Sequence, residues 1–166
     1  GSIYHAKAYA VRGMGIPTWG SFTNKEIQGG GALIDVGTHS IDLVLHVSGN
    51  YEPAYVCGMT YDKIAKRGSD ANQWGNWDYS KIDTEDSAFA LIVMKNKMTI
   101  AVDAAWAMYT SDERMSSFSI YGDQAGFEMC GGVRLVHETG GAMCKVYPQI
   151  AQPKSLMAPN KGTESS

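Results

Sequence analysis

The first residues of the chain alternate between two kinds of side chain, which is the pattern of a β-strand. Larger side chains occupy the odd-numbered positions from Ile3 to Val11, whereas the even-numbered positions are mostly alanine. Successive residues of a strand point to opposite faces, so this segment predicts a strand with one face made almost entirely of alanine. Another element can approach such a face closely.

A long helix is predicted over residues 30–47, after an irregular stretch over 13–28. Leucine, isoleucine and valine cover most of its circumference, so the helix should be buried. Gly49 follows the last turn, where glycine is a common stop signal. Gly37 lies inside the helix at a cost of about 1 kcal/mol relative to alanine, which indicates a close neighbour at that point.

The rest of the pattern predicts strands joined by short turns. They span residues 54–62, 86–94, 97–108, 115–121, 126–130, 133–138 and 142–147. The connections Lys95-Asn96, Gly131-Gly132 and Gly140-Gly141 contain residue types that accept positive φ, and successive hairpins predict antiparallel pairing. The expected fold class is α+β: a large, mainly antiparallel β-sheet with one face covered by a helix.

Domain boundaries follow from the same pattern. Residues 1–151 form one domain, and the polar segment over 66–83, with Trp74 and Trp77, is a long excursion between two strands. Residues 152–166 are too polar to order themselves and predict a flexible tail. The strand over 88–93 has apolar residues on both faces and needs cover on both. Self-association through the open face of the sheet, as a homodimer or tetramer, would supply that cover.

Composition excludes several classes of partner. The 14 Lys and Arg residues are fewer than the 17 Asp and Glu residues, giving a net charge of -3, so nucleic acid and anionic membranes are poor partners. The longest apolar runs fall far short of the roughly 20 residues that span a membrane. Cys57, Cys130 and Cys144 are an odd number without close spacing. They indicate core residues of a cytoplasmic protein rather than a disulfide framework.

Four ionisable residues lie along one side of the predicted helix. Asp35, His39, Asp42 and His46 fall within a stripe roughly 60° wide at about 100° per residue. Asp35 and His39 follow a glycine triplet, where backbone can approach a ligand, and a carboxylate one turn from an imidazole suits general acid/base catalysis.

Other interpretations of the stripe remain open. All four residues can simply pair along a buried face, and this structural interpretation is favoured for Asp42 and His46. A metal site is the rival for the first pair, but Asp42 is the only further ligand within a turn, so no metal is predicted.

The same residues resemble a known signature. The run Gly29-Gly30-Gly31-x-x-x-Asp35-x-Gly37-x-His39-x-x-Asp42 is similar to the one that opens the C-terminal domain of the Gfo/Idh/MocA oxidoreductases, named after glucose-fructose oxidoreductase and inositol dehydrogenase. Further matches over residues 3–130 are Arg12, Gly15-x-Pro17-x-Trp19-Gly20, Asp83-x-Glu85-Asp86-Ser87-Ala88, Trp106 and Ile120-Tyr121-Gly122-x-x-x-Gly126.

The resemblance implies both a fold and an activity. The fold is a dihydrodipicolinate-reductase-like C-terminal domain, and the activity is NAD(P)-dependent oxidation of a sugar, polyol or related hydroxyl or carbonyl compound. In this family the equivalents of Asp35 and His39 bind substrate and relay the proton that accompanies hydride transfer. Gly29, Gly30 and Gly31 would form the loop near substrate and cofactor, and Arg12 and Trp19 can reach the cleft.

Two features of the family are missing from the sequence. No Gly-x-Gly-x-x-Gly follows a strand, and there is no Glu-Lys-Pro motif with its catalytic lysine. NAD or NADP is therefore expected on a Rossmann domain of the same protein, outside these residues, and the chain alone should bind no dinucleotide and be inactive. The alternative is a stand-alone antiparallel-sheet domain that binds a sugar or acts as a scaffold without redox chemistry.

Overall fold

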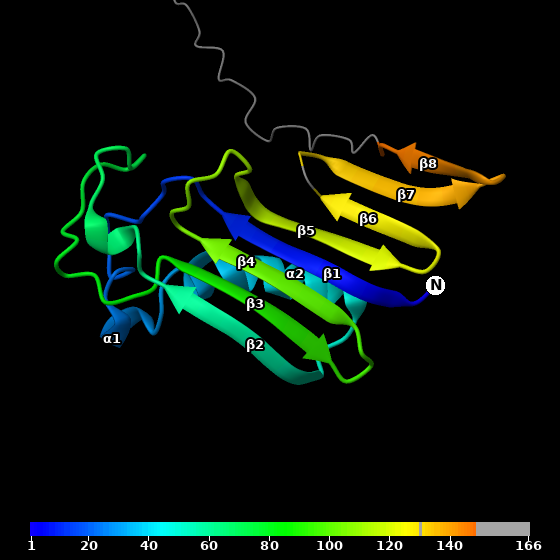
Figure 1. The fold of residues 1–166 in the computed structure, drawn as a ribbon, viewed down its shortest axis with the longest axis horizontal. Coiled ribbons are helices and arrows are strands. Elements are labelled where there is room, and N and C mark those ends of the chain that lie inside the picture. Colours follow the sequence, from blue (N-terminus) through cyan, green and yellow to red (C-terminus); the bar gives the residue numbers. More distant parts are fainter. Residues whose placement is uncertain (130, 149–166) are drawn as a thin grey trace, which may run out of the picture.

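The computed structural model describes residues 1–129 and 131–148, which form one eight-stranded sheet and a helical layer (Figure 1). The strands are β1 (Ile3–Val11), β2 (Pro53–Tyr61), β3 (Ser87–Met94), β4 (Thr99–Ala105), β5 (Arg114–Gly122), β6 (Ala125–Met129), β7 (Val133–Thr139) and β8 (Ala142–Val146). The helical segments are α1 (Lys25–Gln28), the π-helix η1 (Leu33–Gly37), α2 (Thr38–Ser48) and the 3-10 helix η2 (Ala65–Arg67). The predicted α+β fold is confirmed.

The sheet order is β2-β3-β4-β1-β5-β6-β7-β8, which places the first strand in the middle. β1 pairs with β4 in parallel, and the other pairs are antiparallel. The hairpin pattern did not predict the parallel pair. It arises because the chain crosses from β1 through α2 to β2, returns through the long excursion to β3 and reaches β4 by a hairpin. A crossover through a helix is how parallel strands are connected.

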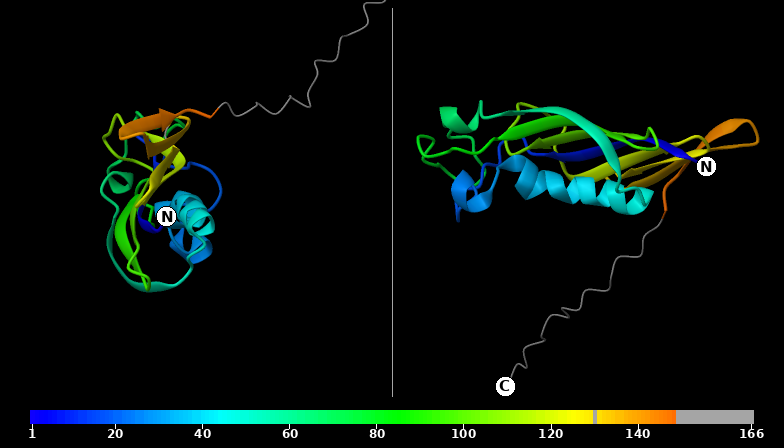
Figure 2. Two further views of the ribbon diagram at one scale, coloured as in Figure 1. Left: turned by 90° about the vertical axis from the view of Figure 1, so that its right-hand side faces the viewer. Right: turned by 90° about the horizontal axis from the view of Figure 1, so that it is seen from below.

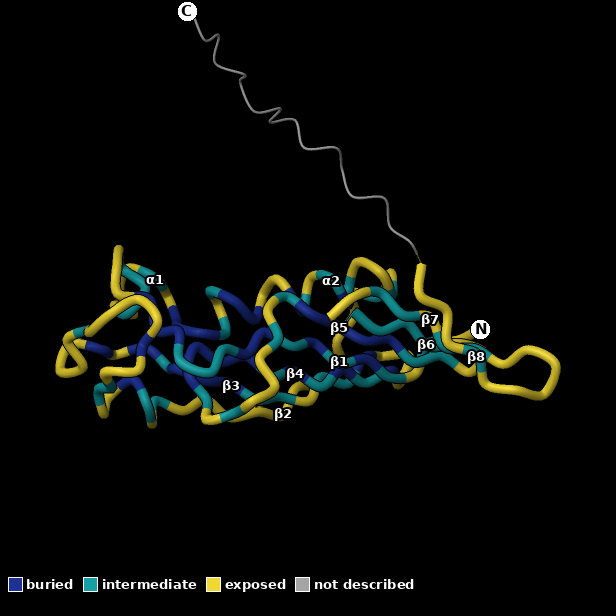
Figure 3. The backbone as a smooth tube through the Cα atoms, turned by 90° about the horizontal axis from the view of Figure 1, so that it is seen from above, coloured by how far each residue is buried: buried dark blue, intermediate teal, exposed yellow. Residues whose placement is uncertain are grey.

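The alanine face of β1 packs beneath the helical layer, as predicted. Ala6, Ala8 and Ala10 are fully buried, and α2 runs along this one face of the sheet (Figure 2). A Cβ added to Gly37 would lie 2.9 Å from the Ala104 Cβ, so glycine is what lets η1 approach β4. Figure 3 shows the buried backbone concentrated between the two layers.

The helix differs from the prediction at its beginning. Residues 33–37 form a π-helix, in which Thr38 N–H bonds to the Leu33 carbonyl, and a regular α-helix begins only at Thr38. The spacing of 100° per residue does not hold across a π-helical turn. The predicted stripe of four ionisable side chains is therefore interrupted between Asp35 and His39.

Two smaller predictions need correction. Positive φ occurs at Lys97 rather than at Lys95-Asn96, although the two glycine pairs after it have the expected conformation. Cys57 is exposed and Cys144 only half-buried, because β2 and β8 are the edge strands of a sheet whose middle is covered. Cys130 and the predicted tail over 152–166 lie outside the described residues.

No helix of the described ranges is long and apolar enough to span a membrane.

Candidate functional site

Asp35 is fixed inside the domain by a tryptophan and an arginine. Trp106 Nε1 donates a hydrogen bond to Asp35 Oδ2 at 2.7 Å, and Arg12 Nη1 lies 3.8 Å from the same oxygen. Trp106 follows β4 and is completely buried. Arg12 follows β1, so the carboxylate of η1 lies where two neighbouring central strands end.

The guanidinium of Arg12 is held on several sides. Its Nη1 donates to the Gly15 carbonyl at 3.2 Å, its Nε donates to Met115 Sδ at 3.3 Å, and its Cζ lies 4.9 Å above the ring centre of Trp74. Burial lowers the pKa of Arg12, and the nearby Asp35 carboxylate offsets part of that effect. The side chain therefore holds a positive charge in one place between an aromatic ring and a carboxylate.

Trp19 and Trp74 form an exposed aromatic pair beside Arg12. Their ring centres are 5.0 Å apart with the planes at 85°, and Trp19 also makes an edge contact with Phe22 at 6.0 Å. Trp77 behaves differently, since its Nε1 donates to the Ala65 carbonyl at 2.7 Å and its ring packs on the buried cluster around Trp106. Trp77 therefore fixes the excursion against the core of the domain.

His39 lies at the surface, in the first turn of α2. Within residues 1–129 and 131–148 its imidazole makes no hydrogen bond or ion pair, so Asp35 and His39 are not bonded to each other in this conformation, and their catalytic roles stay predictions. Asp42 and His46 are exposed too, rather than paired along a buried face. The cause is the π-helical turn, which directs Asp35 toward Trp106 while α2 presents its polar side to solvent.

The glycine triplet has a structural explanation. A Cβ on Gly31 would lie 1.9 Å from the Glu85 carbonyl oxygen, and Gly29 ends α1 with a φ of 87°. Glu85 accepts the Ala32 N–H at its carbonyl and the Leu33 N–H at Oε1, and thus satisfies the free N–H groups where η1 begins. The close contact with Glu85 explains why residue 31 is glycine. The approach of a ligand to this loop stays a prediction.

Sequence reasoning missed the roles of Glu85 and Asn72. Asn72 is buried and joins two loops: it accepts from Ile16 N–H and donates to the carbonyls of Ile16 and Gly75. The acidic run before β3 could have indicated the role of Glu85, because a carboxylate next to a buried strand needs hydrogen-bond donors from a neighbouring segment. Asn72 sits in a polar segment where its sequence gives no such signal.

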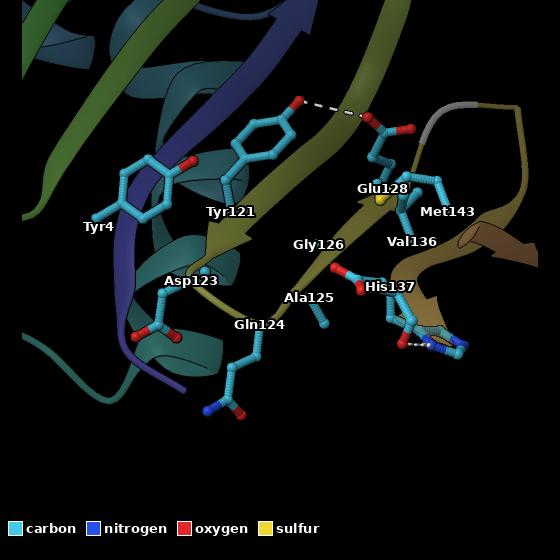
Figure 4. Close-up of a pocket in the computed structure, with 12 residues that line it drawn as sticks. Tyr4, Tyr121, Asp123, Gln124, Ala125, Gly126, Glu128, Val136, His137 and Met143 are labelled. Atoms are coloured by element: carbon cyan, nitrogen blue, oxygen red, sulfur yellow. Dashed lines mark hydrogen bonds between the residues drawn. The ribbon is translucent and has the colours of Figure 1, made fainter. Parts of the chain in front are cut away.

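A hollow lies elsewhere on the sheet. It has a volume of about 290 Å³ and is lined from β5, β6 and β7, with Tyr4, Tyr121 and His137 among its side chains (Figure 4). Tyr4 and Arg12 are eight residues apart on and after β1, which at about 3.3 Å per residue is roughly 26 Å. The hollow is therefore remote from Asp35, and its position gives it no part in the site built around that carboxylate.

Across the described ranges, no three His, Cys, Asp or Glu side chains gather in a way that could hold a metal ion.

Comparison with known families agrees with this arrangement. Residues 1–128 match the model of the GFO/IDH/MocA C-terminal domain. The chain belongs to this family. The match contains the motif from Gly29 to Asp42 together with Arg12 and Trp106.

Relatives and solved structures give the same result. The chain is 37% identical over 151 residues to D-glucoside 3-dehydrogenase of Escherichia coli (strain K12), covering 91% of this chain and 43% of that protein. Aldose-aldose oxidoreductase from Caulobacter crescentus, solved with glycerol, superposes with a TM-score of 0.63 at 18% identity, covering 93% and 42%. Levoglucosan dehydrogenase, solved with NADH and levoglucosan, gives 0.67 at 19%, covering 89% and 40%. The chain thus spans about two fifths of the length of these proteins.

Proposed function

We propose that this chain is the substrate-binding and oligomerisation domain of an NAD(P)-dependent oxidoreductase that acts on a sugar, polyol or related hydroxyl or carbonyl compound. Support comes from family membership, from the 37% identity to a glucoside dehydrogenase and from the position of Asp35. The observation that carries the proposal is a carboxylate held firmly at one oxygen and open at the other.

Asp35 Oδ2 accepts the hydrogen bond from Trp106, whereas Oδ1 has no hydrogen-bond partner in the described residues. No side-chain oxygen of those residues is both buried and unpartnered, so Oδ1 reaches solvent. An oxygen that is pre-positioned in this way can accept a hydrogen bond from a substrate hydroxyl without reorganising. Asp35 therefore orients the substrate in this proposal.

His39 is the proposed proton acceptor. Its exposed imidazole lies one turn after Asp35, and imidazole is the side chain most often used as a general acid or base, which suits proton exchange with a sugar hydroxyl. When the hydroxyl carbon is oxidised, its C–H leaves as hydride, the O–H proton passes to His39, and a C=O bond forms. The reverse direction returns the proton from His39 to the carbonyl oxygen.

The dinucleotide, when bound, supplies the acceptor for the hydride. The residues described here do not form its phosphate cradle, because the glycine triplet joins α1 to η1 rather than following a strand, and Gly31 packs on Glu85. We therefore assign dinucleotide binding to a part of the protein outside this chain and place only substrate and proton handling on these residues.

Replacement of His39 tests the proposal. General acid/base groups contribute about 100- to 10,000-fold to the rate, so His39→Ala in the full-length protein should lower kcat for NAD(P)-linked sugar oxidation within that range. Affinity for the dinucleotide should be unchanged.

The matched control is His46→Ala, two turns further along α2, which should leave kcat intact. If His39→Ala retained more than about a third of wild-type kcat between pH 6 and 9, His39 would not be the proton acceptor. Absence of any NAD(P)-linked sugar oxidation by the wild type would favour the alternative of a sugar-binding or scaffold domain without redox chemistry.

A further inference from the structure

Two tryptophans of this domain are exposed, whereas Trp106 is fully buried. Trp19 exposes 51% of its surface and Trp74 exposes 38%, despite their contact with each other. Leaving large aromatic surfaces in water is unfavourable, and exposed aromatic groups that lie together mark binding surfaces. This Trp19–Trp74 corner is not needed to close the core, which Trp106 fills.

The corner is held in a fixed shape. Asn72 ties the backbone before Trp19 to the backbone around Trp74 through hydrogen bonds of 2.8–3.0 Å with Ile16 and Gly75. Thr18 Oγ1 adds a bond to the Trp74 carbonyl at 3.0 Å. A buried amide whose bonds all go to these two loops fixes their relative position, so the two rings are presented before any ligand arrives.

The corner is also linked to the candidate substrate oxygen. Arg12 Cζ lies 4.9 Å from the ring centre of Trp74 and Arg12 Nη1 lies 3.8 Å from Asp35 Oδ2, so the Trp74 ring centre and the carboxylate are no more than about 10 Å apart. The ring centre of Trp19 lies a further 5.0 Å from that of Trp74, so Trp19 lies within about 15 Å of the Asp35 carboxylate. The guanidinium also places a positive charge at the corner, which disfavours a cationic ligand and leaves the aromatic surface to neutral groups.

We propose that the Trp19–Trp74 corner is a subsite for a ring-closed sugar, whose apolar C–H face packs on the indole of Trp19 while one of its hydroxyls donates to Asp35 Oδ1. This inference rests on the proposed function and narrows its substrate class. A pyranose ring presents a flat face of C–H groups, which matches an aromatic surface, whereas an acyclic polyol has no such face. The domain therefore selects cyclic glycosides over acyclic polyols.

Steady-state kinetics of the full-length protein test this selection. With methyl β-D-glucopyranoside as substrate, Trp19→Ala should raise KM about tenfold and leave kcat within a factor of about two, because the ring contact is made equally in ground and transition states. With D-glucitol, the acyclic polyol with the same six-carbon sugar skeleton but without the ring, KM or the inhibition constant should not change. The matched control is Tyr79→Ala, an exposed aromatic residue of the excursion that contains Trp74, which should have no effect.

Trp19→Phe keeps an aromatic ring and guards against a folding defect in the alanine variant. It should recover most of the glycoside affinity, and the far-ultraviolet circular dichroism of both variants should match the wild type. If both variants leave the KM for the glycoside unchanged while the wild type oxidises it, the subsite is wrong and the proposed function stands.

Intrinsic fluorescence supplies a readout that does not need turnover. Titration with methyl β-D-glucopyranoside should change the tryptophan emission of the wild type, and Trp19→Phe should lose most of that change. A wild type that shows neither turnover nor a fluorescence response to the glycoside would overturn both the subsite and the proposed function. A response that persists fully in Trp19→Phe would overturn the subsite alone.

Discussion

Asp35 and Asp103 are both half-buried carboxylates, but their partners differ. Asp35 meets a hydrogen-bond donor and a cation, whereas Asp103 lies on β4, on the sheet face opposite α2, between Tyr9 of β1 and Phe89 of β3. Burial raises the pKa of Asp103, and Lys7 offsets only part of that shift. The Asp35 carboxylate thus has a donor and a cation beside it, whereas burial disfavours the charged form of Asp103.

This contrast leads to a prediction about pH. The folded-state pKa of Asp103 is above its unfolded value near 3.8, so the folded state binds this proton more tightly. The contribution to stability is complete below pH 3.8 and is lost as pH rises through the folded pKa. Asp103→Asn should therefore raise the Tm of the chain by a few degrees at pH 7 and not at pH 3.

Thermal unfolding followed by circular dichroism at both pH values measures the difference. Asp70→Asn, at an exposed position, is the matched control and should leave Tm unchanged at either pH. An equal shift of Tm at pH 3 and pH 7 for Asp103→Asn would show that ionisation is not the cause.

At the scale of elements, η1 depends on one close contact with the segment before β3. Gly31 packs against the Glu85 backbone, its carbonyl accepts the Asp35 N–H at 3.0 Å, and Glu85 in turn accepts two N–H groups at the start of η1. The conformation that places Asp35 therefore rests on a residue without a side chain.

Gly31→Ala should lower the free energy of unfolding by about 2–4 kcal/mol, because the new Cβ would overlap backbone rather than a flexible side chain. Urea denaturation measures the change. Gly49→Ala is the control, since Gly49 has positive φ, unlike Gly31, but no atom within 4 Å of an added Cβ. It should cost about 1 kcal/mol from its backbone conformation alone. Equal costs for the two variants would contradict the contact between Gly31 and Glu85.

At the scale of the whole molecule, the sheet has one face under α2 and another with no helix of the described residues on it (Figure 2). The pairing register places Cys57, Leu91 and Ala101 side by side on this second face, and Leu91 and Met59 are exposed. An apolar surface of this kind favours association, and a second copy of the chain related by a two-fold axis provides a matching surface.

We expect the chain to form dimers or tetramers through this face at micromolar concentration. Leu91→Lys should shift the species toward the 18.0 kDa monomer in sedimentation velocity, because association would bury an unpaired charge. Val47→Lys, at an exposed position of α2 on the opposite side, should not. A wild type that sediments as a monomer across this range would rule out the open-face interface.

Local patterns were sufficient for the elements and for the candidate chemistry. Alternation in β1 identified its alanine face, glycine pairs located the hairpins, and the spacing from Gly29 to Asp42 pointed to the family. These signals depend on neighbours within a few residues, where side-chain direction follows directly from backbone period. Catalytic roles for Asp35 and His39 stay predictions, to be tested by the replacement of His39.

Contacts between distant residues were decided only by the tertiary structure. Asp35 meets Trp106 across 71 positions and Arg12 meets the ring of Trp74 across 62, while the parallel pairing of β1 with β4 follows from a crossover that no single segment specifies. The π-helical turn at 33–37 likewise separates two residues that their spacing placed together. The sequence determined which side chains each element carries. Packing of η1 against β4 and Glu85 determined which of those side chains meet. Tertiary packing decides this because the intrinsic preference of a short helical segment for a regular α-helix is weaker than the gain from burying a close contact.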